Sequence, residues 1–174
     1  AKEAGVKRYI LSSSCSVYGD GGGNFLTEQS PPHPLTEYAR SSLAAENDVL
    51  ALGDDHYTVT VFRLATVYGV SRRMRFDLVI NIMTLHAVEK GCIHILGAGD
   101  QWRPLVHVRD VARAFREVIA ADRAIVNGQV FNIGRNDQNL QVLPIAYIVR
   151  EALPFFVKTE MTPSDADRRD YKVC

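Results

Sequence analysis

The sequence contains few cysteines and no excess of charge of either sign. Cys15, Cys92 and Cys174 are far apart and none belongs to a CxxC pair, which argues against a disulfide framework and against a cysteine zinc site. The 20 Lys and Arg residues balance 20 Asp and Glu residues. We therefore expect no nucleic-acid partner, because no overall field attracts the chain to a polyanion.

Two further absences concern membranes and metals. No apolar run approaches the roughly 18 residues of a membrane span, and the start of the sequence does not resemble a signal peptide. None of the five histidines lies in an HxxxH or HExxH spacing, so no metal site is predicted. These absences predict a protein of the reducing cytoplasm without a membrane partner.

The composition is that of a globular domain. A chain of 174 residues with 47% hydrophobic content is long enough to bury a core. It opens at Ala1 without Met, and its first residues, AKEAG, resemble the last turn of a helix followed by a terminating glycine. The sequence therefore predicts a fragment of a longer protein.

Strand-like and helix-like segments alternate along the chain. Runs of β-branched and aromatic residues predict strands, and apolar residues at helical spacing predict helices. This alternation is typical of an α/β fold with a mainly parallel sheet. The expected strands are 6–14, 57–69, 92–96, 104–108 and 129–134, and the expected helices run from Thr36 to near Gly53 and over 76–90, 111–121 and 141–152.

Three local features complete this prediction. Residues 19–34 are expected to form a loop, and its GDGGGN stretch fits neither GxGxxG nor GxxxxGK[ST], so it predicts a flexible turn instead of a phosphate-binding loop. The GAGD stretch predicts a turn between the strands 92–96 and 104–108. Asp110 is expected to cap the helix that follows.

Ser14 and Tyr38 are the first candidate site residues. Ser14 ends a predicted strand, and Tyr38 lies 24 residues later in the first turn of a predicted helix. In a doubly wound sheet the C-terminal ends of strands and the N-terminal ends of helices face the crevice where ligands bind. A hydroxyl and a phenolate meeting there would take a proton from a substrate alcohol. Taken alone, such a pair is more often structural, because both residue types are common at these places.

Five segments together resemble the NAD-dependent epimerase/dehydratase family, the extended short-chain dehydrogenases. They follow the order used by that family and span nearly the whole chain. The resemblance implies a Rossmann-like, doubly wound and mainly parallel sheet joined to a small substrate-binding α/β portion. The segments are SSSCSVYG (12–19), EYARSS (37–42), FRLATVYG (62–69), DQWRPLVHVRDVARAF (100–115) and GQVFNIG (128–134).

The resemblance also implies an organisation of the chain. Residues 1–70 correspond to the C-terminal part of the dinucleotide-binding Rossmann domain. Residues 71–174 correspond mostly to the nucleotide-sugar binding portion, with strands that return to the Rossmann sheet. Most of the site for NAD (or NADP), including its GxxGxxG turn, is then expected in a preceding segment. A homodimer is implied as well, and Leu43, Val49 and Leu50 either form its helical interface or pack on the chain's own sheet.

The resemblance assigns roles to residues that match its motifs. Tyr38 matches the base that removes the hydroxyl proton while hydride passes to the nicotinamide. Ser14 matches the residue that polarises the reacting sugar oxygen. Ser12, Ser13 and Ala65, together with Tyr38, match positions on the cofactor side of the site.

Four residues are implied on the substrate side. Arg103 matches an arginine that binds the diphosphate of a nucleotide sugar, since a guanidinium fork suits paired phosphate oxygens; a surface ion pair is the alternative. Asp167 and Arg169 lie in ADRRDY, which resembles a late Asp-x-Arg segment near the same diphosphate, and a solvated charged tail is the alternative. Asn81 is a further candidate to face the sugar.

The sequence departs from the family at Ser42, which stands where Tyr-x-x-x-Lys places its lysine. That lysine lies one helical turn after the tyrosine, binds the nicotinamide ribose and favours the phenolate. Serine supplies neither its charge nor its reach. Arg40 does not substitute, because a residue two positions along a helix points roughly the opposite way.

A second departure bears on the type of reaction. Dehydratases of the family carry acidic residues directly after the active-site hydroxyl, and Cys15 and Ser16 stand there instead. The family's asparagine is also absent from the segment that holds Ala65 and Thr66. The sequence thus favours an epimerase or a simple sugar-nucleotide oxidoreductase over a dehydratase. The alternative is a catalytically impaired member that only binds a dinucleotide or sugar nucleotide.

Overall fold

A sheet of three parallel strands forms the centre of the protein. The computed structural model describes residues 1–163 and 169–174. Its strands β1 (Arg8–Ser14), β3 (Thr58–Leu64) and β7 (Gln129–Ile133) lie in the order β1-β3-β7. Their carboxyl ends meet at one edge, because Ser14 pairs with Leu64 and Leu64 pairs with Ile133. Val59, Val61 and Phe62 of the middle strand are fully buried, as expected for a strand covered on both faces.

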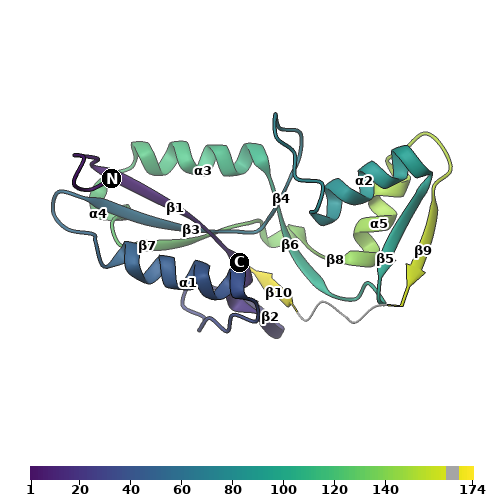
Figure 1. Cartoon of the computed structure of the whole chain (residues 1–174), viewed down its shortest axis with the longest axis horizontal. Coiled ribbons are helices and arrows are strands. Elements are labelled where there is room, and N and C mark those ends of the chain that lie inside the picture. Colours follow the sequence, from purple (N-terminus) through teal and green to yellow (C-terminus); the bar gives the residue numbers. More distant parts are fainter. Residues whose placement is uncertain (164–168) are drawn as a thin grey trace.

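Helices cover both faces of this sheet, which is the doubly wound arrangement that the sequence predicts. Figure 1 shows α1 (Glu37–Leu50) on one side of the strands and α3 (Val108–Ala120) on the other. Alternate side chains of β3 serve the two helices: Phe62 packs against Phe115 of α3, with ring centroids 4.9 Å apart, and Arg63 pairs with Glu46 of α1. The short helix α4 (Arg123–Val126) leads into β7.

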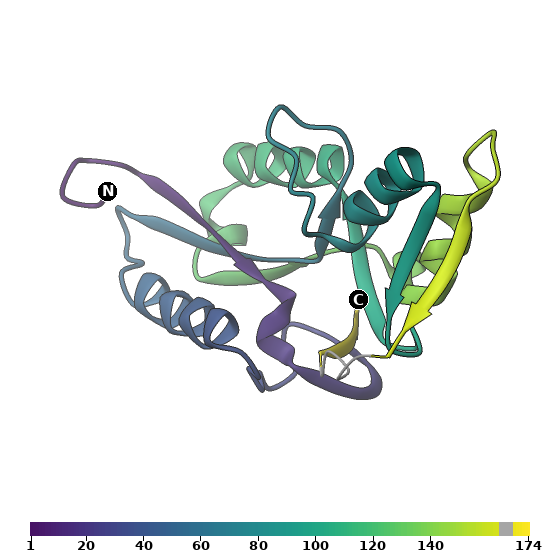
Figure 2. The same cartoon turned by 45° about the vertical axis from the view of Figure 1, so that its right-hand side comes forward.

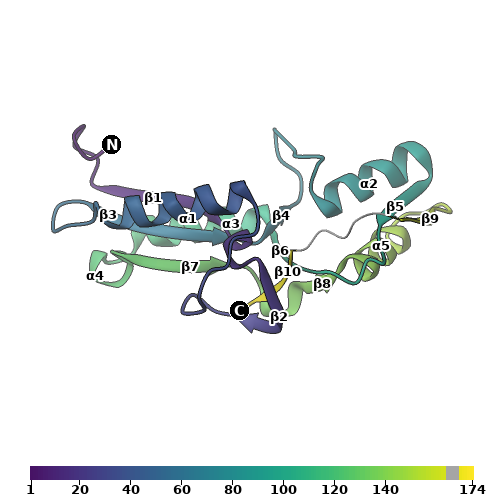
Figure 3. The ribbon, with the colours of Figure 1, turned by 60° about the horizontal axis from the view of Figure 1, so that its bottom comes forward.

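A second group of elements lies beyond the carboxyl edge of the sheet (Figures 1 and 3). It contains α2 (Val79–Lys90), α5 (Val142–Glu151) and the parallel pair β5 (Cys92–Leu96) and β9 (Lys158–Thr162). The connecting strands are β4 (Thr66–Tyr68), β6 (Trp102–His107) and β8 (Asn139–Gln141), with β6 parallel to β4 and antiparallel to β8. A separate core holds this group together, formed by Met83, Ala87, Ile93, Ile95, Leu105, Ile145, Ala146, Val149 and Val157.

The chain crosses between the two groups more than once. Residues 108–133, which include α3 and β7, return to the central sheet after β6. The central sheet thus contains one strand, β7, from the part of the chain after residue 70. Figure 2 shows the same crossing from another side, with β6 and the C-terminal strand between the groups.

The predicted loop over 19–34 is wrong in its first part. Residues 20–26 form the strand β2 (Asp20–Leu26), which pairs in parallel with β10 (Asp170–Val173). Glycines in this stretch weaken the local strand signal, and its partner lies at the far end of the sequence. Next to this pair, the 3₁₀ turn η1 (Cys15–Tyr18) packs with Tyr171 and Val173, and a second turn, η2 (Asn136–Gln138), precedes β8.

One other local expectation needs correction. His107, and not Asp110, is the cap residue of α3, because its Nδ1 accepts a hydrogen bond from the Arg109 amide at 3.2 Å. The GAGD stretch does contain a turn between β5 and β6, and each of these strands pairs elsewhere, β5 with β9 and β6 with β4 and β8. The end of α2 at Gly91 is confirmed, and this glycine has the left-handed φ of 63° that it adopts readily.

Leu43 of α1 packs inside the chain. It contacts the buried cluster that contains Cys15 and Tyr18 of η1 and Tyr171 of β10, and this cluster lies outside the central sheet. Formation of a homodimer through α1 stays a prediction. Across residues 1–163 and 169–174, none of the helices combines the length and the apolar character that a membrane crossing requires.

Thr36 begins α1 with a side-chain cap. Its Oγ1 accepts a hydrogen bond from the Ala39 amide at 3.1 Å. We expect Thr36→Ala to lower the free energy of unfolding by about 1 kcal/mol, because the first turn of the helix loses its cap. Thr36→Ser, which keeps the hydroxyl, should unfold close to wild type in urea. Equal losses in the two variants would contradict the role of the hydroxyl.

Candidate active site

The carboxyl edge of the central sheet borders a cavity of about 570 Å³. Ser14 and Tyr38 both line it, as the topology of strand end and helix start requires. The predicted cofactor-side residues Ser12, Ser13 and Ala65 line the same cavity. One space therefore contains all five of these predicted residues.

Ser14 is held by a turn of the backbone. Its Oγ accepts a hydrogen bond from the Ser16 amide at 3.2 Å and caps η1. Because the oxygen serves as an acceptor here, the hydroxyl hydrogen can be donated to a group in the cavity. The turn thus orients Ser14 as a hydrogen-bond donor.

Tyr38 extends from the first turn of α1, and the residue is 59% exposed. Its carbonyl oxygen accepts hydrogen bonds from the hydroxyls of Ser41 at 2.9 Å and Ser42 at 2.8 Å. Ser42 is thereby turned back to its own helix and is not among the residues that line the cavity. The structure supplies no cation at this position of α1, where the family lysine would stand.

Two arginines line the cavity of Ser14 and Tyr38. They are Arg75 and Arg169, and none of the cavity's described lining residues is acidic. Arg75 pairs with Asp77 at 2.6 Å, and this hydrogen-bonded carboxylate raises the pKa of the guanidinium, with a smaller contribution in the same direction from nearby Tyr38. Such a space suits an anionic ligand.

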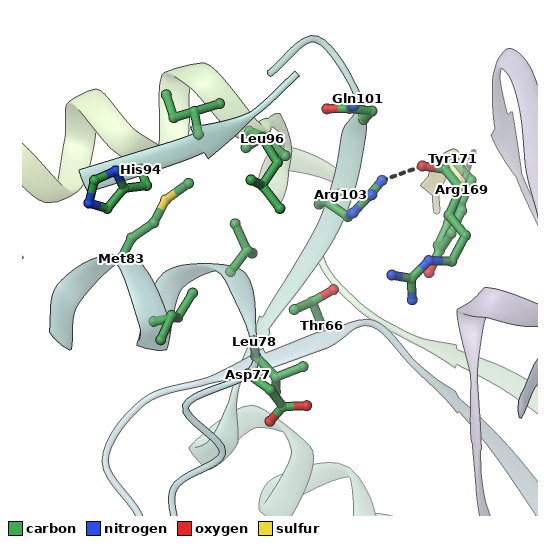
Figure 4. Close-up of a pocket in the computed structure, with 14 residues that line it drawn as sticks. Thr66, Asp77, Leu78, Met83, His94, Leu96, Gln101, Arg103, Arg169 and Tyr171 are labelled. Carbon is green, nitrogen blue, oxygen red and sulfur yellow. Dashed lines mark hydrogen bonds between the residues drawn. The ribbon is translucent and has the colours of Figure 1, made fainter. Parts of the chain in front are cut away.

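A second cavity, of about 350 Å³, adjoins the first, and Figure 4 shows the residues that line it. The two share Thr66, Leu78, Arg169 and Tyr171. Apolar residues of α2, β5 and α5 form much of its wall, whereas Gln101 and Arg103 supply polar groups, and Arg103 donates a hydrogen bond to the Arg169 carbonyl. The two cavities form one elongated space with Ser14 and Tyr38 in one part and Arg103 in the other.

The predicted substrate-side residues separate into three outcomes. Arg103 and Arg169 line the second cavity, although they lie 66 positions apart. Asn81 is buried and lines neither cavity, because its side-chain amide donates to the Arg75 carbonyl at 2.9 Å; it braces the Arg75 loop instead of facing a sugar. Asp167 lies outside the described residues.

A buried ion pair lies beneath the strand ends. Glu46 of α1 and Arg63 of β3 are 1% and 6% exposed, and their side chains are joined by a 2.8 Å contact. Ser13 donates to the same carboxylate, and Arg63 also donates to the Tyr18 hydroxyl at 2.9 Å. Burial opposes the charge of Arg63, but its hydrogen bonds to Glu46 and Tyr18 raise the pKa of the guanidinium. The pair fixes the position of α1 against β1 and β3.

The two residues after Ser14 have different surroundings. Cys15 is fully buried, its thiol donates to the Arg63 carbonyl at 3.1 Å, and burial raises its pKa strongly. The buried Ser16 hydroxyl lines the cavity and has no hydrogen-bond partner within residues 1–163 and 169–174. Neither side chain provides a carboxyl group beside the reacting hydroxyls.

Several site residues are absent from the sequence prediction. Arg75 lies in a loop whose three arginines are too few to define a basic patch, and Tyr171 enters the site only through the β2–β10 pairing. Glu46 and Arg63 could have been found from the sequence. Glu46 is a charged residue on an otherwise apolar helix face and Arg63 is one within an otherwise apolar strand, and such charged residues are usually paired when they are buried.

Comparison with known proteins identifies the family of this chain. The family model of the NAD dependent epimerase/dehydratase family matches residues 1–134. The chain belongs to this family. Its α/β fold is accordingly the Rossmann type of the extended short-chain dehydrogenases.

Individual members of the epimerase/dehydratase family match almost the whole chain. A dTDP-D-glucose 4,6-dehydratase of Mus musculus is 29% identical over 172 residues, which cover 98% of this chain and 46% of the relative. A UDP-glucuronate 4-epimerase of Thermodesulfobacterium geofontis is 26% identical over 91% of this chain and 48% of the relative. The structure of MoeE5 in complex with UDP-glucuronic acid and NAD superposes with a TM-score of 0.85 at 31% identity, covering 99% of this chain and 57% of MoeE5. The chain thus spans about half the length of the curated relatives it matches.

Proposed function

We propose that this chain carries the proton-transfer and substrate-binding residues of an NAD-dependent nucleotide-sugar epimerase or a related sugar-nucleotide oxidoreductase. The observation that carries the proposal is the shared cavity of Ser14 and Tyr38 at the carboxyl edge of a parallel sheet. Membership of the epimerase/dehydratase family supports the same reaction class.

The cofactor would lie at the strand ends. Ser12, Ser13, Ala65 and Tyr38 would hold it, and their fit is favoured by the small side chains that line the cavity there. When bound, NAD supplies the acceptor for the hydride that leaves the sugar carbon. MoeE5, which shares this fold, binds NAD.

Tyr38 is the base in this proposal. Its phenolate oxygen would take the proton of the sugar hydroxyl, so that the C–OH group loses a proton to Tyr38 and a hydride from carbon and becomes a ketone. Ser14 would donate its hydroxyl hydrogen to the same sugar oxygen. This hydrogen is available because Ser14 Oγ is the acceptor in its contact with the Ser16 amide. The ketone carbon would then regain the same hydride on its other face and the oxygen would regain the proton from Tyr38, which completes an epimerisation with no net oxidation.

The elongated space supports a nucleotide-activated substrate. A sugar beside Ser14 and Tyr38 would have its diphosphate near Arg169 and Arg103, whose guanidinium groups suit phosphate oxygens. The apolar wall of the second cavity would cover the nucleoside. MoeE5 binds UDP-glucose and UDP-glucuronic acid.

We favour an epimerase over a dehydratase because the described residues that line the cavity of Ser14 and Tyr38 include no carboxyl group, and Asp77, which lines the adjoining cavity, is paired with Arg75. Eliminating water needs an additional acid and base, and neither the buried Cys15 thiol nor the Ser16 hydroxyl serves that purpose near neutral pH. The relatives include dehydratases and an epimerase, so they support the shared oxidation step.

Ser42 favours a second candidate function, a non-catalytic protein that binds a dinucleotide or sugar nucleotide. The two are separated by incubating the full natural chain with NAD and UDP-glucose, UDP-glucuronic acid or dTDP-glucose, and following the sugar by NMR. We expect the C4 epimer. Cofactor binding without turnover of any of these substrates would support the second candidate, and a 4-keto-6-deoxy product would overturn the preference for an epimerase.

Ser42→Lys is expected to increase turnover by roughly tenfold or more, because a lysine here would favour the Tyr38 phenolate and each 1.4 kcal/mol in the barrier is worth about tenfold. Ser41→Lys is the matched control, since it adds the same charge one position away on α1. Initial rates with saturating NAD decide the result. Equal rates for both variants would show that charge at residue 42 has no specific effect.

A further inference from the structure

Strands β5 and β9 bring together three metal-binding side chains away from Ser14 and Tyr38. Cys92 and His94 alternate with the buried Ile93 along β5, so they lie on the same face of the strand. Glu160 of β9 stands directly opposite His94 in the parallel register. A sulfur, an imidazole nitrogen and a carboxylate oxygen of these three residues all lie within 4.8 Å of one another.

The three side chains already share contacts. The Glu160 carboxylate lies 3.4 Å from His94 Nδ1 and 2.5 Å from the Lys158 ammonium group, and it also interacts with the Cys92 thiol. Cys92 and Glu160 are half-buried, so the group is open to an entering ion while the strand pairing holds its backbone. Lys158 is the cation that now occupies one side of the carboxylate.

The donor set matches zinc. Tetrahedral Zn²⁺ takes sulfur at about 2.3 Å and nitrogen or oxygen at about 2.0–2.2 Å, which corresponds to donor atoms roughly 3.5 Å apart. The three donor atoms already lie within 4.8 Å of one another, so binding would draw them closer together. His86 on α2 is the candidate for a fourth ligand: it lies outside the group of three, but its ring is 6.0 Å from that of His94, centroid to centroid.

We propose that Cys92, His94 and Glu160 bind a Zn²⁺ ion, with His86 as the fourth ligand. Binding replaces the thiol proton of Cys92, which leaves to solvent, and displaces Lys158 from the Glu160 carboxylate. The thiolate and the carboxylate then balance the two charges of the ion. The site was missed in the sequence because only the Cys-x-His pair is local and Glu160 is distant along the chain.

The site would stiffen one wall of the substrate cavity. His94 also lines the 350 Å³ cavity that contains Arg103, and an ion bound to it would join β5, β9 and α2 at that wall. The inference stands independently of the proposed reaction, because it concerns the outer part of the substrate portion and not the Tyr38 site.

The test titrates the full natural chain, stripped with EDTA, with Zn²⁺ in competition with a chromophoric chelator. We expect one ion per chain, and Co²⁺ in place of Zn²⁺ should give the near-ultraviolet absorption of a thiolate ligand. Cys92→Ser should abolish that absorption and weaken Zn²⁺ binding at least tenfold. Cys174→Ser is the matched control, since this exposed cysteine lies outside the cluster, and it should bind as wild type.

A second pair of variants guards against unfolding of the first. Lys158→Met should tighten Zn²⁺ binding, because it removes the competing ammonium group, whereas Glu160→Gln should weaken it. Zn²⁺ at a fixed concentration should raise the melting temperature of wild type and of Cys174→Ser more than that of Cys92→Ser, since an ion that binds only the folded state stabilises it in proportion to its affinity. Equal Zn²⁺ affinities for wild type, Cys92→Ser and Glu160→Gln would overturn the proposal.

Discussion

Tyr38→Phe is expected to lower the turnover of a nucleotide sugar by about 10²–10⁴-fold, the usual contribution of a positioned acid–base group. The phenyl ring keeps the volume and the helix of Tyr38 but has no oxygen to accept the sugar proton. Since Tyr38 is largely exposed in the cavity, the loss of its hydroxyl leaves no buried group unpaired. The folded structure should therefore stay intact.

Steady-state rates with NAD and the substrate that wild type converts measure this effect, and calorimetry measures whether Tyr38→Phe still binds that substrate. Tyr147→Phe is the matched control, because Tyr147 is exposed on α5 and lines neither cavity. A rate for Tyr38→Phe within about twofold of the Tyr147→Phe rate would remove Tyr38 from the reaction. Retained binding with lost turnover is the expected pattern.

The parts of the fold that sequence predicts well are those set by local pattern. The apolar run over 57–69 becomes β3 and β4 because a strand covered on both faces needs apolar residues on both sides. Thr36 caps α1 with its own hydroxyl, and Gly91 ends α2 because glycine readily adopts the left-handed backbone conformation. The shared cavity of Ser14 and Tyr38 follows from topology, because strand ends and helix starts meet at one edge.

The parts that sequence does not predict depend on distant pairing. The β2–β10 contact joins residues near 20 to residues near 170, and it brings Tyr171 into the site. Arg75 reaches the cavity through an irregular loop whose path no periodicity describes. The contact of Asn81 could not be predicted from the sequence. Helical spacing indicates on which face of a helix a residue lies, but it does not indicate that the side-chain amide will bind a backbone group, here the Arg75 carbonyl.

Arg63→Met is expected to lower the free energy of unfolding by about 3–5 kcal/mol, the usual cost of removing one partner from a buried ion pair. The Glu46 carboxylate is 1% exposed, and among residues 1–163 and 169–174 it would keep only its hydrogen bond from Ser13. The Tyr18 hydroxyl would lose the guanidinium donor at 2.9 Å as well. Equilibrium unfolding in urea, followed by circular dichroism, measures the change.

The double variant Glu46→Leu with Arg63→Met distinguishes two sources of the stability loss in Arg63→Met: the lost attraction between the two side chains and the unpaired Glu46 carboxylate that stays buried. If the loss in Arg63→Met comes from the carboxylate left in the interior, removing that carboxylate too should restore part of the stability, since apolar replacements of a buried pair are often nearly neutral. Arg135→Met serves as the control, because the Arg135–Asp137 pair is exposed and should give no measurable change. Additive losses in the double variant would mean that each side chain acts through separate contacts, and then the pair would not be what aligns α1 with the strand ends that carry Ser14.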